Sequence, residues 1–212
     1  MDRYTRHRQR HGIFRQSACC RQTANGIFGL KLFWHQLPAL IAKLRAAPCL
    51  ADAPAEASLH DLLKAKLGAA PRYIWLRRRD KLSQAISYLR ASKSGIWRST
   101  DAASDDGRCD ADLAFDFDLI AQLVRLVHHS DLRWKAFFRE HQIGVLEIVY
   151  EDFVAPYDAS VFRILEFLGI SRDGVVVTPP RLQRQADART LEWRDRFIEL
   201  GKERGVVSPR RR

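Results

Sequence analysis

The segment of residues 72–98 constrains the fold of this chain more than any other, because its residue pattern changes abruptly. Residues 73–76 are apolar and aromatic in a row, which is typical of a β-strand buried on both faces. Three arginines follow at residues 77–79, and Asp80 is of a type that caps helices. Residues 81–90 then have the pattern of a helix. The sequence therefore predicts a strand, an arginine-rich turn and a helix.

This strand–turn–helix unit has the outline of an anion-binding site. The N-terminus of a helix supplies N–H groups and a partial positive charge. An arginine guanidinium supplies a planar fork that suits phosphate oxygens. Ser83 and Ser87 are four residues apart, so both hydroxyls lie on one face of the predicted helix. The alternative, on spacing alone, is a surface turn whose arginines are only solvated.

The positive charge of the chain is concentrated at its two ends. The net charge is +11, of which residues 1–22 carry +5 and residues 210–212 carry +3. Residues 23–209 therefore carry only +3. A nucleic-acid-binding domain needs a basic face with interleaved aromatic side chains on its folded body. We therefore expect no nucleic-acid partner.

The cysteines and histidines predict neither a metal site nor a disulfide framework. No CxxC pair occurs, and the only histidine pair, at residues 128–129, lies within a helical pattern. No run of about 18 apolar residues occurs, so we expect no transmembrane helix. The basic N-terminus lacks a following apolar stretch, so we expect no secretory signal and a cytoplasmic protein. The four cysteines are Cys19, Cys20, Cys49 and Cys109.

Residues 23–209 have the periodicity of one domain, whereas the ends differ from it. Residues 1–22 lack any apolar period, so we expect a disordered basic segment, and residues 210–212 are a short basic tail. Strands that alternate with helices predict an α/β fold with a parallel sheet flanked by helices. We expect strands at residues 27–34, 72–77 and 145–150, and helices at residues 37–45, 58–67, 81–90, 115–141, 159–168 and 189–200.

Three segments stand out together: TANGIFGLKLFWHQL, WLRRRDKLSQAISYLRASKSGIWR and LQRQADARTLEWRDRF. In this order and spacing they resemble the bacterial trehalose sulfotransferase (Stf0-type) family, and the resemblance covers roughly residues 23–197. It implies a sheet with P-loop-like sulfotransferase topology. It also implies transfer of a sulfuryl group from the donor 3′-phosphoadenosine 5′-phosphosulfate to a hydroxyl of a sugar or glycolipid acceptor, without a metal.

The resemblance assigns the nucleotide-binding residues to two segments. Arg78 is expected to bind the 3′-phosphate of the nucleotide as a fork, with a hydroxyl from Ser83 or Ser87. The motif that contains Arg184 and Gln185 is expected to form the second wall of the nucleotide pocket.

A third segment resembles the acceptor side of the family. Its matching residues are Lys31, Trp34, His35 and Gln36. His35 departs from the family, which commonly has an amide at that position. The alternative for Trp34 is a role in core packing. The same alternative applies to Trp97, which lies in the second of the three segments.

One departure from the family concerns the chemistry itself. The family has a first strand followed by a Ser/Gly-rich loop, whose N–H groups bind the phosphosulfate, and a glutamate base soon after it. The sequence contains no such loop before Asn25, so no catalytic residue is assigned. We expect the chain to be the C-terminal portion of such an enzyme, with impaired activity and unpaired strand edges. The alternatives are a non-catalytic module that binds anions or nucleic acid, and a product without function.

Overall fold

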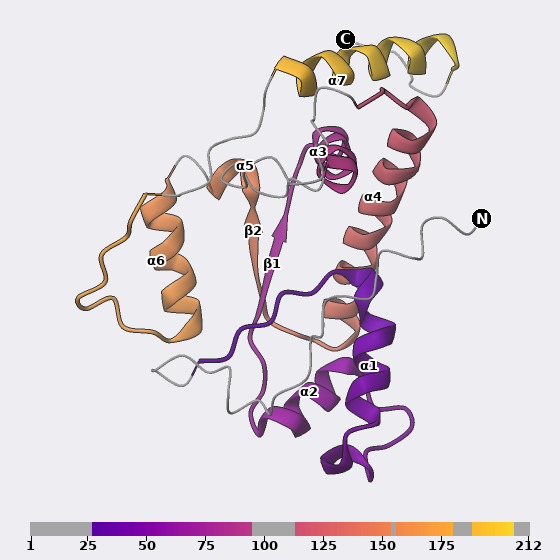
Figure 1. Cartoon of the computed structure of the whole chain (residues 1–212). Coiled ribbons are helices and arrows are strands. Elements are labelled where there is room, and N and C mark those ends of the chain that lie inside the picture. The colour runs from indigo at the N-terminus through magenta and orange to yellow at the C-terminus, as the bar shows by residue number, and fades with distance from the viewer. Residues whose placement is uncertain (1–26, 95–112, 154–155, 180–187, 206–212) are drawn as a thin grey trace. The chain divides into compact units, whose positions relative to one another are not determined.

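The computed structural model describes residues 27–94, 113–153, 156–179 and 188–205. They belong to two compact units, whose boundary lies between Pro71 and Arg72 (Figure 1). This boundary lies inside the range 23–209 that the sequence predicts as one domain. Each unit is described by itself.

The first unit is helical and packs around leucine side chains. Its elements are η2 (Trp34–Gln36), α1 (Leu37–Arg45), η3 (Pro48–Leu50) and α2 (Leu59–Leu67). The Ser58 hydroxyl accepts the N–H of Asp61 at 3.2 Å, and the Asp61 carboxylate accepts the N–H of Ser58 at 3.0 Å. Gly68 has a φ of +69° and ends α2, as the sequence predicts. The buried leucines are Leu37, Leu40, Leu44, Leu50, Leu59, Leu62 and Leu63.

The predicted strand at residues 27–34 is wrong. Residues 27–33 form neither strand nor helix, and residues 34–36 form η2. The N–H of Phe33 donates to Oε1 of Gln36 at 3.0 Å, and the N–H of Gln36 donates to the carbonyl of Phe33 at 2.9 Å. This reciprocal pair begins a helical turn in place of an extended strand.

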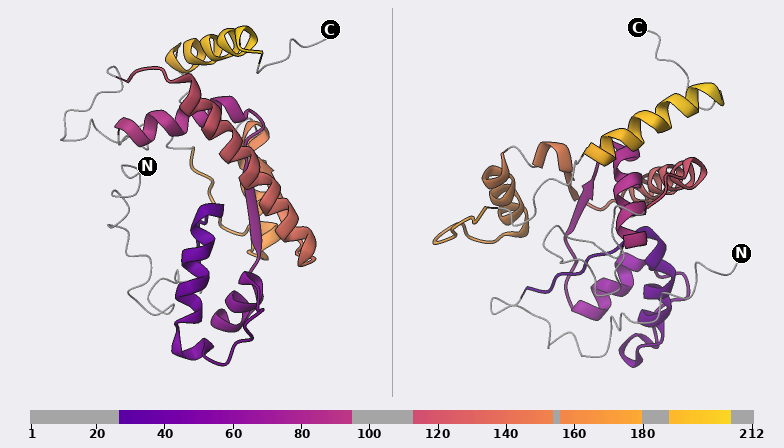
Figure 2. Two further views of the ribbon diagram at one scale, coloured as in Figure 1. Left: turned by 90° about the vertical axis from the view of Figure 1, so that its right-hand side faces the viewer. Right: turned by 45° about the horizontal axis from the view of Figure 1, so that its top comes forward.

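The second unit contains a parallel two-stranded sheet and helices. Its elements are β1 (Tyr73–Arg77), α3 (Lys81–Ser94), α4 (Phe117–Glu140), β2 (Val145–Val149), α5 (Tyr150–Phe153), α6 (Tyr157–Leu168) and α7 (Ala188–Glu203). The two strands pair from Tyr73 opposite Val145 to Arg77 opposite Val149. Figures 1 and 2 show the two strands side by side within this unit. The α/β class with a parallel sheet is confirmed.

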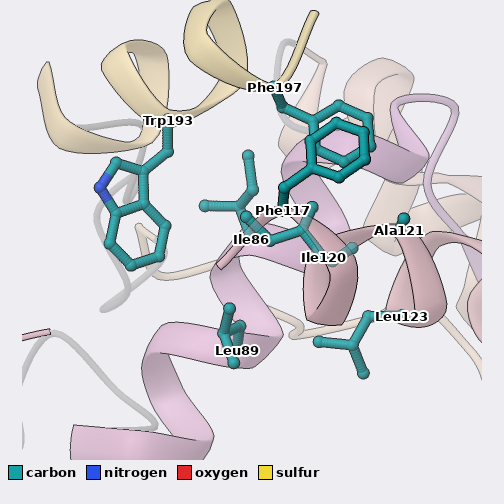
Figure 3. Close-up of a cluster of buried hydrophobic side chains, with 9 residues drawn as sticks. Ile86, Leu89, Phe117, Ile120, Ala121, Leu123, Trp193 and Phe197 are labelled. Carbon is teal, nitrogen blue, oxygen red and sulfur yellow. The ribbon is translucent and has the colours of Figure 1, made fainter. Parts of the chain in front are cut away.

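The core of the second unit lies among α3, α4 and α7 (Figure 3). The Phe117 and Phe197 rings stack with centroids 4.5 Å apart, and Phe115 meets Trp193 edge-on at 5.8 Å. Ile86 of α3 is fully buried between these groups. This packing fixes α3, the helix that begins directly after the arginine turn.

The prediction that the first strand of this unit is buried on both faces is wrong. Tyr73 and Trp75 pack against Phe138 of α4, with ring centroids 5.7 and 5.9 Å away. On the opposite face Ile74 is 39% exposed and Leu76 is 61% exposed. No described helix contains 18 residues apolar enough to cross a membrane.

Candidate functional site

The register of the parallel sheet places two polar segments opposite each other. Arg77 pairs with Val149 at the carboxyl ends of β1 and β2. One residue further along both strands, the Arg78 guanidinium lies 4.6 Å from the ring centroid of Tyr150. One residue beyond that, the N–H of Arg79 donates to Oε2 of Glu151 at 2.9 Å. The arginine turn is therefore built against the start of α5.

The three consecutive arginines have different partners. Arg77 donates from Nε to the carboxylate of Glu147 on β2. Arg79 donates from Nη2 to both carboxylate oxygens of Asp152, at 2.7 and 2.9 Å, and its side chain is 63% exposed. Arg78 makes no ion pair with any described residue, and its Nε is buried without a hydrogen-bond partner there. Arg78 is therefore the arginine of this turn whose guanidinium is not bonded to a described carboxylate.

Asp80 caps α3 and uses up the hydroxyl proton of Ser83. Its carboxylate accepts the N–H of Ser83 at 3.0 Å, the Ser83 hydroxyl at 2.8 Å and Nη1 of Arg194 at 2.8 Å. Burial raises the pKa of Asp80, but the two bonds from Ser83 and the charges of Arg194 and Arg78 outweigh burial, so the pKa is lowered. The carboxylate is therefore charged at neutral pH.

Ser83 and Ser87 differ in what they can offer an anion. A hydroxyl has one proton to donate, and Ser83 donates it to Asp80. The hydroxyl of Ser87 has no hydrogen-bond partner among the described residues, and its side chain is half-buried one turn further along α3. Within the described chain, Ser87 is the serine whose donor is available.

The backbone of the turn already binds a carboxylate. Glu151 accepts the N–H of Arg79 through one oxygen and the N–H of Asp80 through the other, at 2.9 and 3.2 Å. Burial raises the pKa of Glu151, but these N–H groups and the charge of Arg78 outweigh it, so the pKa is lowered. The amides that the sequence predicts for an external anion are therefore partly satisfied from within the chain.

The helix after the predicted second wall is attached to the same turn. Arg184 and Gln185 lie outside the described residues, and α7 begins at Ala188. Arg194 of α7 bonds Asp80, so α7 is tied to the N-terminus of α3.

The predicted acceptor-side residues belong to the first unit, where Trp34, His35 and Gln36 form η2 and Lys31 precedes it. Lys31 lies 5.2 Å from the ring centroid of Phe33, and the ring of Phe33 stacks on that of His35 at 5.7 Å. Gln36 bonds the N–H of Phe33, and Trp34 is half-buried. Arg78, Ser83 and Ser87 belong to the second unit.

Three residues of the site were not identified from the sequence: Tyr150, Glu151 and Arg194. The first two could have been found, because the carboxyl ends of parallel strands meet at one edge of a sheet. Aligning the ends of the two predicted strands, at residues 77 and 150, places Glu151 opposite Arg78, and the observed register moves this by one residue to Tyr150. No signal in the sequence pointed to Arg194. No cluster of three or more His, Cys, Asp or Glu side chains within the described ranges could hold a metal ion.

Comparisons with known proteins agree on one family. The family model for Stf0 sulphotransferases matches residues 3–199, which includes most of the basic segment 1–22. The trehalose 2-sulfotransferase of Mycobacterium tuberculosis is 29% identical over 176 residues, and that of Mycolicibacterium smegmatis is 28% identical over 176 residues. Each match covers 83% of this chain and 62% of the relative, so the chain spans less than two thirds of their length. Since the family model matches nearly the whole sequence, the chain belongs to the Stf0 sulphotransferase family.

Proposed function

We propose that the turn after β1 binds the 3′-phosphate of 3′-phosphoadenosine 5′-phosphosulfate, the donor for sulfuryl transfer to a hydroxyl of a sugar or glycolipid. The observation that carries the proposal is the buried Nε of Arg78, which has no partner among the described residues. Burying a neutral donor without a hydrogen-bond partner costs about 1 to 3 kcal/mol, and burying one on a charged group costs more. Buried charged donors are therefore usually hydrogen-bonded to a ligand, a water molecule or an ion.

The charges around Arg78 fit a phosphate at this position. A phosphate group carries roughly −1.5 to −2 at neutral pH and accepts charge-assisted hydrogen bonds from a planar guanidinium. Its neighbours Arg77 and Arg79 are neutralised by Glu147 and Asp152, whereas Arg78 forms no ion pair with a carboxylate in the described ranges. The hydroxyl of Ser87 supplies a second donor on the adjoining helix.

The proposed chemistry needs groups beyond this turn. In sulfuryl transfer the acceptor oxygen forms a bond to sulfur, the bond between sulfur and the donor's phosphate oxygen breaks, and the hydroxyl proton passes to a base. The 212-residue sequence contains no Ser/Gly-rich loop to hold the phosphosulfate. We therefore propose that the chain by itself binds the nucleotide and is impaired in turnover. Lys31, Trp34, His35 and Gln36 are the proposed acceptor-side residues, and Arg184 and Gln185 the proposed second wall of the nucleotide pocket.

The test is a calorimetric titration of the full chain at fixed, moderate salt. Adenosine 3′,5′-bisphosphate should bind more tightly than adenosine 5′-monophosphate, because only the former has a 3′-phosphate. Arg78→Ala should weaken binding of the bisphosphate roughly 10- to 100-fold. Arg78→Lys should recover only part of this loss, because lysine keeps the charge but lacks the planar fork of the guanidinium. Arg79→Ala is the matched control and should weaken binding of the bisphosphate much less than Arg78→Ala does, since Arg79 is exposed and bonded to Asp152. Equal binding of the two nucleotides, or a folded Arg78→Ala chain with the parent's affinity, would contradict the proposal.

A further inference from the structure

We propose that Tyr150 and Glu151 are positioning residues that hold Arg78 in the orientation needed for the 3′-phosphate, an inference that rests on the proposed function. Both follow β2 directly, and the strand register brings them against the turn that follows β1. Neither residue is assigned to the nucleotide site by the sequence motifs.

Tyr150 orients the guanidinium of Arg78 without using its donors. The N–H groups of a guanidinium lie in its plane, whereas contact with an aromatic ring uses the face. The Arg78 guanidinium lies 4.6 Å from the centroid of the Tyr150 ring. Arg77 and Arg79 are instead held by carboxylates, which accept from Nε of Arg77 and from Nη2 of Arg79. Among the three arginines, Arg78 is thus the one held by a ring contact, with no bond to a described carboxylate.

Glu151 acts on the backbone beside Arg78. It accepts the N–H groups of Arg79 and Asp80, the two residues that follow Arg78 in the turn. These two bonds fix the path of the chain between β1 and α3, and therefore the point from which the Arg78 side chain extends. No hydrogen bond joins Glu151 to the Arg78 side chain in the described structure, so Glu151 acts through the main chain.

The direction in which replacing Glu151 changes nucleotide affinity distinguishes a positioning role from a purely electrostatic one. Glu151 places a negative charge near the bound phosphate, so removing that charge alone would strengthen anion binding. A positioning role predicts the opposite, because the turn loosens. Asp152 provides a matched control: it lies on the same short helix, carries the same charge and, within the described part of the chain, bonds only the exposed Arg79 side chain. Glu151→Gln and Asp152→Asn therefore make the same change in charge and differ in what they release.

The experiment measures the affinity of the full chain for adenosine 3′,5′-bisphosphate and for adenosine 5′-monophosphate by calorimetry. Tyr150→Leu should weaken the bisphosphate roughly 3- to 10-fold, and Tyr150→Phe, which keeps the ring, should match the parent within about twofold. Glu151→Gln should bind the bisphosphate roughly 3- to 10-fold more weakly than Asp152→Asn. The 5′-monophosphate affinity should be the same in all four variants, whereas general damage to the fold would change both nucleotides.

The outcomes distinguish this inference from the proposed function. If the parent prefers the bisphosphate and Arg78→Ala loses that preference, while Tyr150→Leu and Glu151→Gln both keep it, the positioning role is wrong and the phosphate site stands. If the parent shows no preference, both are wrong. If Tyr150→Leu fails to fold by circular dichroism, the Glu151→Gln and Asp152→Asn pair decides the question, because both variants preserve side-chain size.

Discussion

Three consecutive arginines at residues 77–79 have the same side chain and three different environments, set by the partners that the sheet brings to them. Arg77 and Arg79 are bonded to carboxylates, whereas Arg78 lies over an aromatic ring and its buried Nε has no partner among the described residues. A carboxylate neutralises a guanidinium and accepts from its donors, but an aromatic ring does neither. The different environment of Arg78 is therefore a consequence of strand register.

The two serines of α3 should respond differently to substitution. Ser83→Ala removes a bond to the capping Asp80 and should lower the free energy of unfolding by about 0.5 to 1.5 kcal/mol. Ser87→Ala should leave the free energy of unfolding unchanged. It should weaken binding of adenosine 3′,5′-bisphosphate by about 1 kcal/mol, because we propose that the Ser87 hydroxyl donates to the phosphate. Urea denaturation and calorimetry measure the two quantities. A loss of nucleotide affinity in Ser83→Ala alone would show that the assignment is reversed.

The lowered pKa of Asp80 predicts how its contribution to stability depends on pH. Its ordinary pKa is 3.8, and the folded value is lower. Between these values the unfolded chain binds a proton that the folded chain does not, so the stability from Asp80 is present above pH 3.8 and is lost as pH falls through the lowered pKa. Urea denaturation of parent and Asp80→Asn from pH 7 to about pH 3 should show a stability difference that narrows with acidification. A difference independent of pH would refute this.

At the scale of elements, α7 joins the core to the site. Its apolar face packs Trp193 and Phe197 into the cluster with α3 and α4 (Figure 3). Arg194 of the same helix bonds Asp80, the cap of α3. Packing and cap together hold the N-terminus of α3 next to the arginine turn.

This role predicts a sharp contrast between two positions on α7. Trp193 is 3% exposed, so Trp193→Ala should lower the free energy of unfolding by about 3 to 5 kcal/mol through the lost burial and the cavity left behind. Leu191 is 52% exposed, and Leu191→Ala should change the free energy of unfolding by less than about 0.5 kcal/mol. Chemical denaturation followed by circular dichroism compares them. Similar losses for both would mean that α7 is not anchored by its apolar face.

The elements that the sequence predicted well have local signals. The capping pair of Ser58 and Asp61 and the glycine after Leu67 define α2, and apolar periodicity defines α4. The strand expected at residues 27–34 failed because strand formation needs a pairing partner, which a local pattern does not specify. The exposure of Leu76 was missed for a similar reason: burial depends on which helices cover a face.

The same division applies to the site. The sequence predicted the arginine turn and its capping Asp80 from residues 77–80, but it did not predict that Arg78 has different partners from its neighbours. That reason lies in Tyr150, Glu147 and Asp152, more than 65 residues away along the chain, and in the pairing that aligns them. The choice of Ser87 over Ser83 likewise needed the side-chain bond to Asp80.

At the scale of the whole molecule, the chain spans 62% of the length of its curated relatives. An assay of sulfuryl transfer measures what this chain does by itself. We expect the 212-residue chain alone to transfer no labelled sulfuryl group from the nucleotide donor to trehalose. The reason is that the sequence contains neither the phosphosulfate-binding loop nor the glutamate base that follows it in the family. A general base contributes about 10² to 10⁴ in rate, and a hydrogen-bond donor to the developing charge contributes about 10² to 10³. A mycobacterial relative serves as the positive control. Turnover of order 1 per second would mean that another group, such as Glu56 or His35, acts as the base.

The most direct test of the central claim is to observe the donors of Arg78 while nucleotide binds. Two-dimensional ¹H–¹⁵N spectra resolve arginine Nε–H signals, and Arg78→Lys identifies the signal of Arg78. Adenosine 3′,5′-bisphosphate should shift the Arg78 signal and leave those of Arg77 and Arg79 in place, because Glu147 accepts Nε of Arg77 and Asp152 holds the Arg79 guanidinium through Nη2. Adenosine 5′-monophosphate should shift it little. A bisphosphate that binds while the Arg78 signal stays unmoved would contradict the account.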